Sequence, residues 1–256
     1  MKTTINYVLL TAIRDWIFIA IIAALGLALF LSNFLASTVM VEKQQMLTSF
    51  LAGSSRFVLI AGITVFICFH VRKAFENKEV ELMLSRPISR STFIFSYWLG
   101  FCIVALLMLA ILSLTIMLFF HYNYFGLSTW VTTMIFELMI ISAFAVFASV
   151  ILKSSVTSVL LSAGFYIVSR MIGFFGYVLE KNYATDFLSF DFITQKIIWA
   201  ISFLLPRLDL FAQTEWLLYG PAEAGVGQWY LPVVQALIYV PLLLFMAVVD
   251  FKRKQF

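Results

Sequence analysis

Charge is scarce in this chain of 256 residues. Asp, Glu, Lys and Arg make up 12% of it, 63% of the residues are hydrophobic, and the mean hydropathy is +1.02. A soluble domain carries roughly 25% charged residues. One soluble core could not bury so much apolar surface, so the composition excludes a soluble protein and predicts an integral membrane protein.

Histidine and cysteine are also rare, with two of each. Cys68 and Cys102 lie inside apolar runs, which favours packing over a disulfide framework or a metal site. His70 and His121 are expected at opposite membrane faces, roughly 30 Å apart, too far to share a metal. Neither H-E-x-x-H nor Gly-x-Ser-x-Gly occurs, so we expect no catalytic residues and no bound metal. An intramembrane enzyme with a serine or aspartyl site is kept as an alternative.

A phosphate-binding loop is missing as well. The motif G-x-x-x-x-G-K-[ST] is absent, and no Gly-Lys pair occurs anywhere in the sequence. We therefore expect no nucleotide or other cofactor in this chain. Nucleic acid is not an expected partner, because the net charge of +4 comes from basic residues that mostly flank apolar runs.

Long apolar runs are what the chain has in abundance. A membrane helix needs about 20 mostly apolar residues. The charge-free run 91–136 is too long for one helix, and the turn-forming sequence HYNYFG at 121–126 divides it. The chain is therefore expected to be all-α, one transmembrane domain over 1–256 with spans at about 16–36, 47–71, 92–120, 128–152, 156–179 and 231–249. No internal repeat is visible, which argues against a channel or an ion-coupled secondary transporter.

The basic residues predict the topology. Of the 17 lysines and arginines, eleven fall on the side of the N-terminus, four on the other side, and two inside spans. This bias predicts that both termini are cytoplasmic. In the outer loop 180–230, the apolar stretch 197–205 is too short to cross a bilayer and predicts short outer helices between spans five and six.

The segment before the first span predicts an amphipathic helix on the inner membrane surface. Its apolar residues recur at helical spacing, whereas Arg14 and Asp15 interrupt the run and argue against a cleaved signal peptide. The alternative is that this segment simply continues span one. The apolar residues are Ile5, Val8, Leu9, Ala12, Ile13 and Trp16.

Between spans two and three lies VRKAFENKEVELMLSRPISRSTF, 71–93. Phe75, Val80 and Leu84 give a short helix one apolar side, and acidic residues give it a charged one. Arg86-Pro87 ends this helix, because a residue before proline avoids the helical region. The pattern predicts a compact helix–turn–helix at the inner surface. The alternative is an ordinary loop with snorkelling arginines.

Three segments resemble the ABC-2-type transporter permeases. ELMLSRPISRSTFIFSYWLG, 81–100, resembles the family's acidic helix, Leu-rich turn and Pro-hydrophobic-Ser-Arg segment. FLLPRLDLFAQTEWLLYG, 203–220, resembles its Leu-Pro-x-Leu-x-x-Phe element, and FKRKQF, 251–256, its basic-aromatic tail. With six spans, the resemblance covers essentially the whole chain. Glu79-Val80 and Tyr97-Trp98 depart from the family's usual Gly-Thr and Gly-Lys, so the subfamily and its substrate stay open.

The resemblance implies a transmembrane subunit of an ABC exporter in the plasma (inner) membrane. It would pair with a second copy or a related permease and with two copies of an ATPase subunit that holds ATP and Mg. The substrate is unidentified, with an amphiphilic or lipid-like molecule as the candidate. A non-transporting membrane scaffold is the alternative. The ATPase would contact a coupling helix around 76–90 and the turn between spans four and five, through Glu76, Glu79, Glu81, Arg86, Pro87, Arg90 and Lys153.

Three charged residues are predicted inside the membrane: Arg56, Glu137 and Arg170. Counted along their helices, all lie roughly 22–24 Å from the inner boundary. Such residues are costly and usually have a partner or a function. We expect Glu137 to pair with Arg170, Arg56 or both. The cluster would line the translocation path or its outer gate, or would simply lock helices together.

Overall fold

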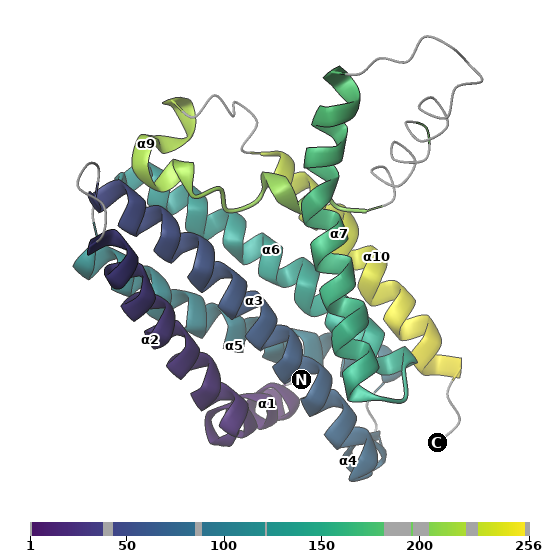
Figure 1. Cartoon of the computed structure of the whole chain (residues 1–256). Coiled ribbons are helices and arrows are strands. Elements are labelled where there is room, and N and C mark those ends of the chain that lie inside the picture. The colour runs from purple at the N-terminus through teal and green to yellow at the C-terminus, as the bar shows by residue number, and fades with distance from the viewer. Residues whose placement is uncertain are drawn as a thin grey trace.

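The computed structural model describes residues 2–37, 43–84, 89–120, 122–181, 196, 205–223 and 230–253. In these ranges the chain is helical and contains no strand. Six helices are long and apolar enough to cross a membrane (Figure 1), which confirms the predicted number of spans. They are α2 (Trp16–Ser37), α3 (Lys43–Glu76), α5 (Arg90–Phe119), α6 (Tyr124–Ile151), α7 (Ser155–Lys181) and α10 (Leu231–Arg253).

Helix α3 extends beyond the predicted span 47–71 at both ends. Its 34 residues make it about 51 Å long at 1.5 Å per residue. A hydrocarbon layer is about 30 Å thick. The polar ends of α3 therefore emerge from the layer and carry Lys43, Arg72, Lys73 and Glu76 outside it.

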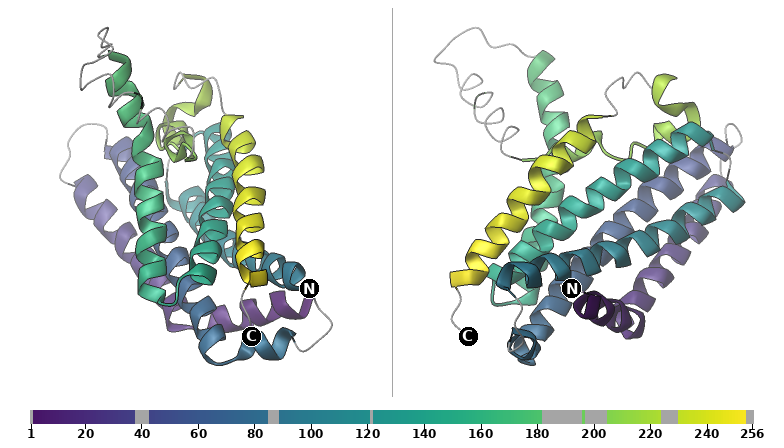
Figure 2. Two further views of the ribbon diagram at one scale, coloured as in Figure 1. Left: turned by 90° about the vertical axis from the view of Figure 1, so that its right-hand side faces the viewer. Right: turned by 180° about the vertical axis from the view of Figure 1, so that it is seen from behind.

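The connections gather at two opposite ends of the bundle (Figures 1 and 2). One end, called the α4 end, holds α1 (Lys2–Arg14), α4 (Glu79–Leu84), the α6–α7 turn and the last turn of α10. The other, called the η1 end, holds η1 (Leu208–Leu210) and α9 (Glu215–Glu223). The predicted outer helix at 197–205 lies outside the described residues except for Leu205.

Helix α1 is separate from α2 and lies across the spanning helices (Figure 2), so it does not continue span one. The break falls at Asp15, whose Oδ1 accepts a hydrogen bond from the Ile17 N–H at 3.0 Å. A Cβ on Gly100 of α5 would lie 2.9 Å from Val8, so the two helices touch closely there. The apolar residues of α1 do not share one packed face, because Val8 is buried whereas Ile13 is exposed.

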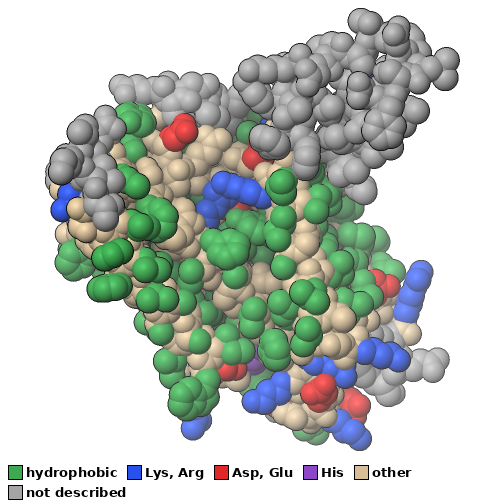
Figure 3. All heavy atoms as spheres, in the orientation of Figure 1, with side chains coloured by type: hydrophobic (Ala, Val, Ile, Leu, Met, Phe, Trp, Pro, Cys, Tyr) green, Lys and Arg blue, Asp and Glu red, His purple; other side chains and the backbone are tan. Residues whose placement is uncertain are grey.

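Helix α6 forms the centre of the bundle. Over its most apolar stretch 67% of α6 is buried, against 22% for α2 and for α7. Helices α3, α5, α7 and α10 pack around it. The exposed side chains of the outer helices are mostly apolar (Figure 3), as a surface in contact with lipid requires.

Helix α9 is fixed closely to the start of α6. The Asn123 side chain caps α6 by accepting from the N–H of Phe125 at 3.0 Å and of Gly126 at 3.1 Å. The Asn123 N–H donates to the Leu217 carbonyl at 2.8 Å. A Cβ on Gly126 would lie 1.7 Å from the Trp216 carbonyl oxygen, so only glycine permits this approach. The contact anchors the segment 205–214 that precedes α9.

We expect Gly126→Ala to destabilise the protein by about 1–3 kcal/mol, because the new methyl group must displace backbone atoms of α9. The measurement is the free energy of unfolding in mixed micelles. Gly26→Ala is the matched control, since nothing lies within 4 Å of its Cβ; it should be neutral or slightly stabilising because alanine favours the helix. Equal stability of the two variants would contradict the close contact.

Candidate functional site

Three charged side chains from three spanning helices meet inside the bundle. Glu137 of α6 and Arg56 of α3 are buried, with exposed fractions of 0% and 3%. Arg56 Nη2 forms a salt bridge with Glu137 Oε1, and Arg170 Nη1 of α7 lies 3.9 Å from the same oxygen. The structure thus brings together all three residues that were predicted to share one depth, with Glu137 between the two arginines.

The segment 205–214, called the strap, passes over this cluster and offers it backbone carbonyls. Arg56 Nη1 donates to the Ala212 carbonyl at 2.9 Å. Arg170 Nη1 donates to the carbonyls of Leu208 at 2.5 Å and Phe211 at 3.2 Å. The strap has only one short helical turn, in which the Phe211 N–H donates to the Leu208 carbonyl at 3.2 Å, and the arginines add donors for its carbonyls.

The strap is held from its other side as well. The Ala212 N–H donates to Thr133 Oγ1 of α6 at 3.1 Å. Ala212 has φ 40, a left-handed conformation uncommon for a residue with a side chain. Such a conformation persists where surrounding contacts impose it. Here the bonds to Arg56 and Thr133 impose it, so the strap's path depends on the cluster.

Two further charges lie beside the cluster. Arg207 Nη2 is 3.0 Å from Asp209 Oδ2, and Asp209 packs against α7, where a Cβ on Gly173 would lie 2.0 Å from that oxygen. Three arginines therefore face two carboxylates, Glu137 and Asp209. Among the described residues, the site carries one positive charge in excess.

The predicted coupling residues that the structure describes lie at the opposite, α4 end, where acidic and basic side chains gather (Figure 3). In α4, Val80 is buried while Glu81 and Leu82 are exposed. The Tyr7 hydroxyl donates to Glu79 Oε2 and so joins α1 to α4. Burial is the larger cause, and the nearby Glu79 carboxylate the second, of a rise in the pKa of Tyr7 to about 12. The phenol therefore keeps the proton that it donates.

The remaining coupling residues divide into two groups. Arg90 Nη1 donates to the Lys252 carbonyl at 2.9 Å and so joins α5 to α10. Glu76 forms an exposed salt bridge of 2.8 Å with Arg72, and Lys153 is exposed in the α6–α7 turn. Arg86 and Pro87 lie outside the described residues.

An aromatic cluster around His70, near the α4 end, was not foreseen from the sequence. Ring centroids of Tyr7, Phe66, Tyr97 and Phe101 lie 5.4–5.9 Å from the His70 ring. In the described part of the chain, His70 Nε2 and the Tyr97 hydroxyl are buried without hydrogen-bond partners. The signal was present as aromatic residues at helical spacing in α3 and α5, but their meeting depends on helix rotation.

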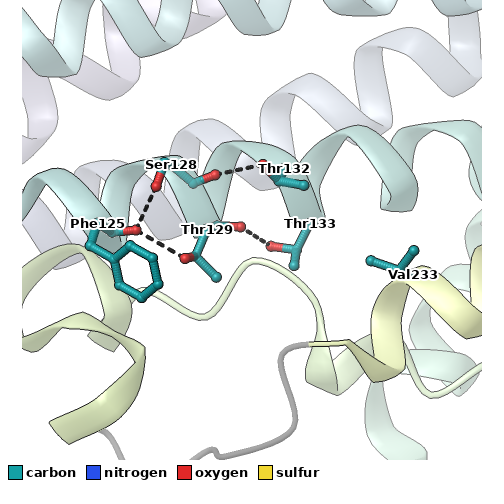
Figure 4. A pocket seen from close by; sticks show the side chains of 6 residues that line it. All are labelled: Phe125, Ser128, Thr129, Thr132, Thr133 and Val233. Atoms are coloured by element: carbon teal, nitrogen blue, oxygen red, sulfur yellow. Dashed lines mark hydrogen bonds between the residues drawn. The ribbon is translucent and has the colours of Figure 1, made fainter.

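A cavity of about 150 Å³ borders α6 and α10 at the η1 end (Figure 4). Its hydroxyl groups donate to carbonyls of their own helix at 2.7–2.9 Å, so their oxygens can act only as acceptors. Among the described residues, no charged group lines this cavity. The lining residues are Phe125, Ser128, Thr129, Thr132, Thr133 and Val233.

The two sites suit different kinds of chemistry. The α4 end presents exposed charges, whereas the cluster holds charges buried between candidate spanning helices. Within the described ranges, no three residues among His, Cys, Asp and Glu are grouped to hold a metal ion. Comparison with protein-family models gives no match, and comparison with curated proteins gives none either.

We expect Glu137→Gln to destabilise the protein by about 3 kcal/mol, because it leaves Arg56 buried without its counter-ion. Adding Arg56→Gln should recover at least about 1 kcal/mol, so the two effects should be clearly non-additive. The measurement is a double-mutant cycle of unfolding free energies in micelles.

The exposed pair Arg72–Glu76 provides the matched control for this cycle. The cycle of Arg72→Gln and Glu76→Gln should give a coupling energy below about 0.5 kcal/mol, as is usual for exposed pairs along a helix. Similar coupling energies in the two cycles would contradict a special role for the buried pair.

Proposed function

We propose that this chain is the transmembrane subunit of an ATP-driven exporter of the ABC-2 type, working with a separate ATPase subunit. The observation that carries the proposal is helix α4, a short helix held firmly between two spans. Its Val80 is buried and Glu79 is bound by Tyr7, while Glu81 and Leu82 are exposed. A short helix mounted in this way is suited to receive another protein.

Several contacts would carry a force on α4 into the bundle. A tight turn with Lys78 at φ 57 connects α4 to α3. Tyr7 connects α4 to α1, which lies against α5 at Gly100. Arg90 connects the start of α5 to the end of α10. Movement of α4 would therefore reach α3 and α1 directly, α5 through α1, and α10 through α5.

The proposed exporter has a defined orientation in the membrane and defined partners. The α4 end faces the cytoplasm, α1 lies in the membrane interface with its exposed apolar residues, and both termini are cytoplasmic. Two permease copies, or this chain and a related one, pair above two ATPase copies that bind ATP and Mg. The bias of basic residues toward this end supports the orientation. Glu76, Glu81 and Lys153 are exposed at this end and meet the ATPase. Arg86 and Pro87, from the same part of the sequence, are expected to contribute to this contact.

We expect an ATPase with a phosphate-binding loop to co-purify with the wild-type chain, and Glu81→Lys to lower its recovery about ten-fold through charge reversal at the contact. Glu215→Lys is the matched control, since Glu215 is an exposed glutamate at the start of α9 at the opposite end. The measurement is ATPase bound per chain and its hydrolysis rate. Absence of any ATPase from cross-linked wild-type membranes would overturn the proposal and favour a scaffold.

A further inference from the structure

A groove of about 100 Å³ lies between α3 and α7. These helices lie side by side on the face seen in Figures 1 and 3. The lining is apolar apart from the hydroxyls of Thr64 and Tyr166, and Thr64 donates its hydrogen to its own helix at the Ile60 carbonyl, 2.8 Å away. The groove therefore suits a hydrocarbon chain.

Two arginines stand at the η1 end of this groove. Arg56 precedes the lining residue Ile60 by one helical turn, and Arg170 follows Tyr166 by one turn. Residues four apart lie on the same face of a helix. Each wall of the groove thus continues into a guanidinium group, and Figure 3 shows basic side chains opening on this face among apolar ones.

The two arginines share one carboxylate, and Arg56 is its closer partner. Arg56 is bound to Glu137, whereas Arg170 lies 3.9 Å from it and is held mainly by two strap carbonyls. The Arg170 side chain is 34% exposed, and its hydrogen bonds and ion pair with described residues all use Nη1. Nη2 and Nε are therefore left for a ligand. The site's excess of one positive charge calls for an anion.

Arg170 lies deep enough that exposing its charge to lipid hydrocarbon alone would be costly. Helix α7 begins at Ser155, so Arg170 lies about 22 Å along it. This is still within a hydrocarbon layer about 30 Å thick. Exposed cations at such depth pair with an anion or reach the headgroups.

We propose that the groove binds an anionic phospholipid from the leaflet at the η1 end. The headgroup phosphate pairs with Arg170, and one acyl chain lies along Phe57, Ala61 and Val65 of α3 and Ala163 of α7. From Phe57 to Val65 the groove wall is about 12 Å long, which matches the acyl depth of one leaflet, about half of 30 Å. The site needs neither an ATPase nor transport, so it stands independently of the proposed function.

A second copy of the chain fits the groove less well. At this depth its described acidic residues are Glu137 and Asp209, and both are already bound to arginines of their own chain. It would bring apolar side chains to the groove but no anion to Arg170. Charge complementarity therefore favours the lipid.

The test uses the purified full chain and measures, by native mass spectrometry, the lipid retained after exposure to phosphatidylglycerol or phosphatidylcholine with identical acyl chains. We expect about ten-fold more phosphatidylglycerol than phosphatidylcholine to be retained, because a charge-assisted bond to Arg170 distinguishes the two. Arg170→Gln should abolish this preference. Arg72→Gln, which removes a comparably exposed arginine at the α4 end, should keep it.

A second pair of variants tests the groove without changing charge. Ala61→Phe places a ring in the groove from an exposed position and should lower phosphatidylglycerol retention about ten-fold through lost apolar contact. Ala23→Phe, at an exposed position on α2, should have no effect.

Three results would overturn the proposal. One is equal retention of the two lipids by the wild-type chain. Another is competition by glycerol phosphate as effective as that by phosphatidylglycerol, which would indicate a simple anion site. The third is absence of retained lipid together with a change of oligomeric state in Ala61→Phe, which would assign the groove to a second copy. Failure to find an ATPase partner would leave the lipid result unchanged.

Discussion

The η1 half of the molecule depends on the ion pairs that the buried Glu137 carboxylate forms with two arginines. Glu137 lies on α6, the central helix, and is the acid that faces both Arg56 of α3 and Arg170 of α7. A buried charge without a counter-ion is strongly destabilising, whereas a compensated group of charges can be held inside a bundle. Glu137 thus allows three helices to converge while each carries a charge.

The two arginines and the strap supply each other with hydrogen-bond partners. Non-helical backbone at membrane depth is tolerated only where its polar groups find partners inside the protein. The carbonyls of Leu208, Phe211 and Ala212 find them in the two guanidinium groups. In turn, guanidinium groups have five donors, more than one carboxylate can accept. A strap of different sequence could accept the same hydrogen bonds from Arg56 and Arg170 only if its backbone carbonyls followed the same path.

The sequence predicted the features that depend on position along a helix. It missed those that depend on how the helices are rotated about their axes. The six spans follow from long, mostly apolar runs, and the shared depth of Arg56, Glu137 and Arg170 follows from a rise of 1.5 Å per residue. The strap's carbonyls could not be placed, because a non-periodic segment has no preferred path. Likewise, the positions of the apolar residues in α1 did not predict which face of this helix is buried. Gly100 on α5 admits Val8 closely and so decides which side of α1 turns inward.

Helix α3 joins the two ends of the molecule, and this has a mechanical consequence. It carries Arg56 toward one end and leads through the turn at Lys78 into α4 at the other. A continuous helix resists stretching because every turn is closed by hydrogen bonds. Displacement of α3 along its axis would therefore move Arg56, which is bound to both α6 and the strap. In the proposed exporter, movement at α4 would change the cluster as a whole, and with it the charge that Arg170 presents at the end of the lipid groove. The element that would couple the two sites is then a single continuous helix that carries Arg56 of the buried ion pair, which is a physical connection rather than a matter of proximity.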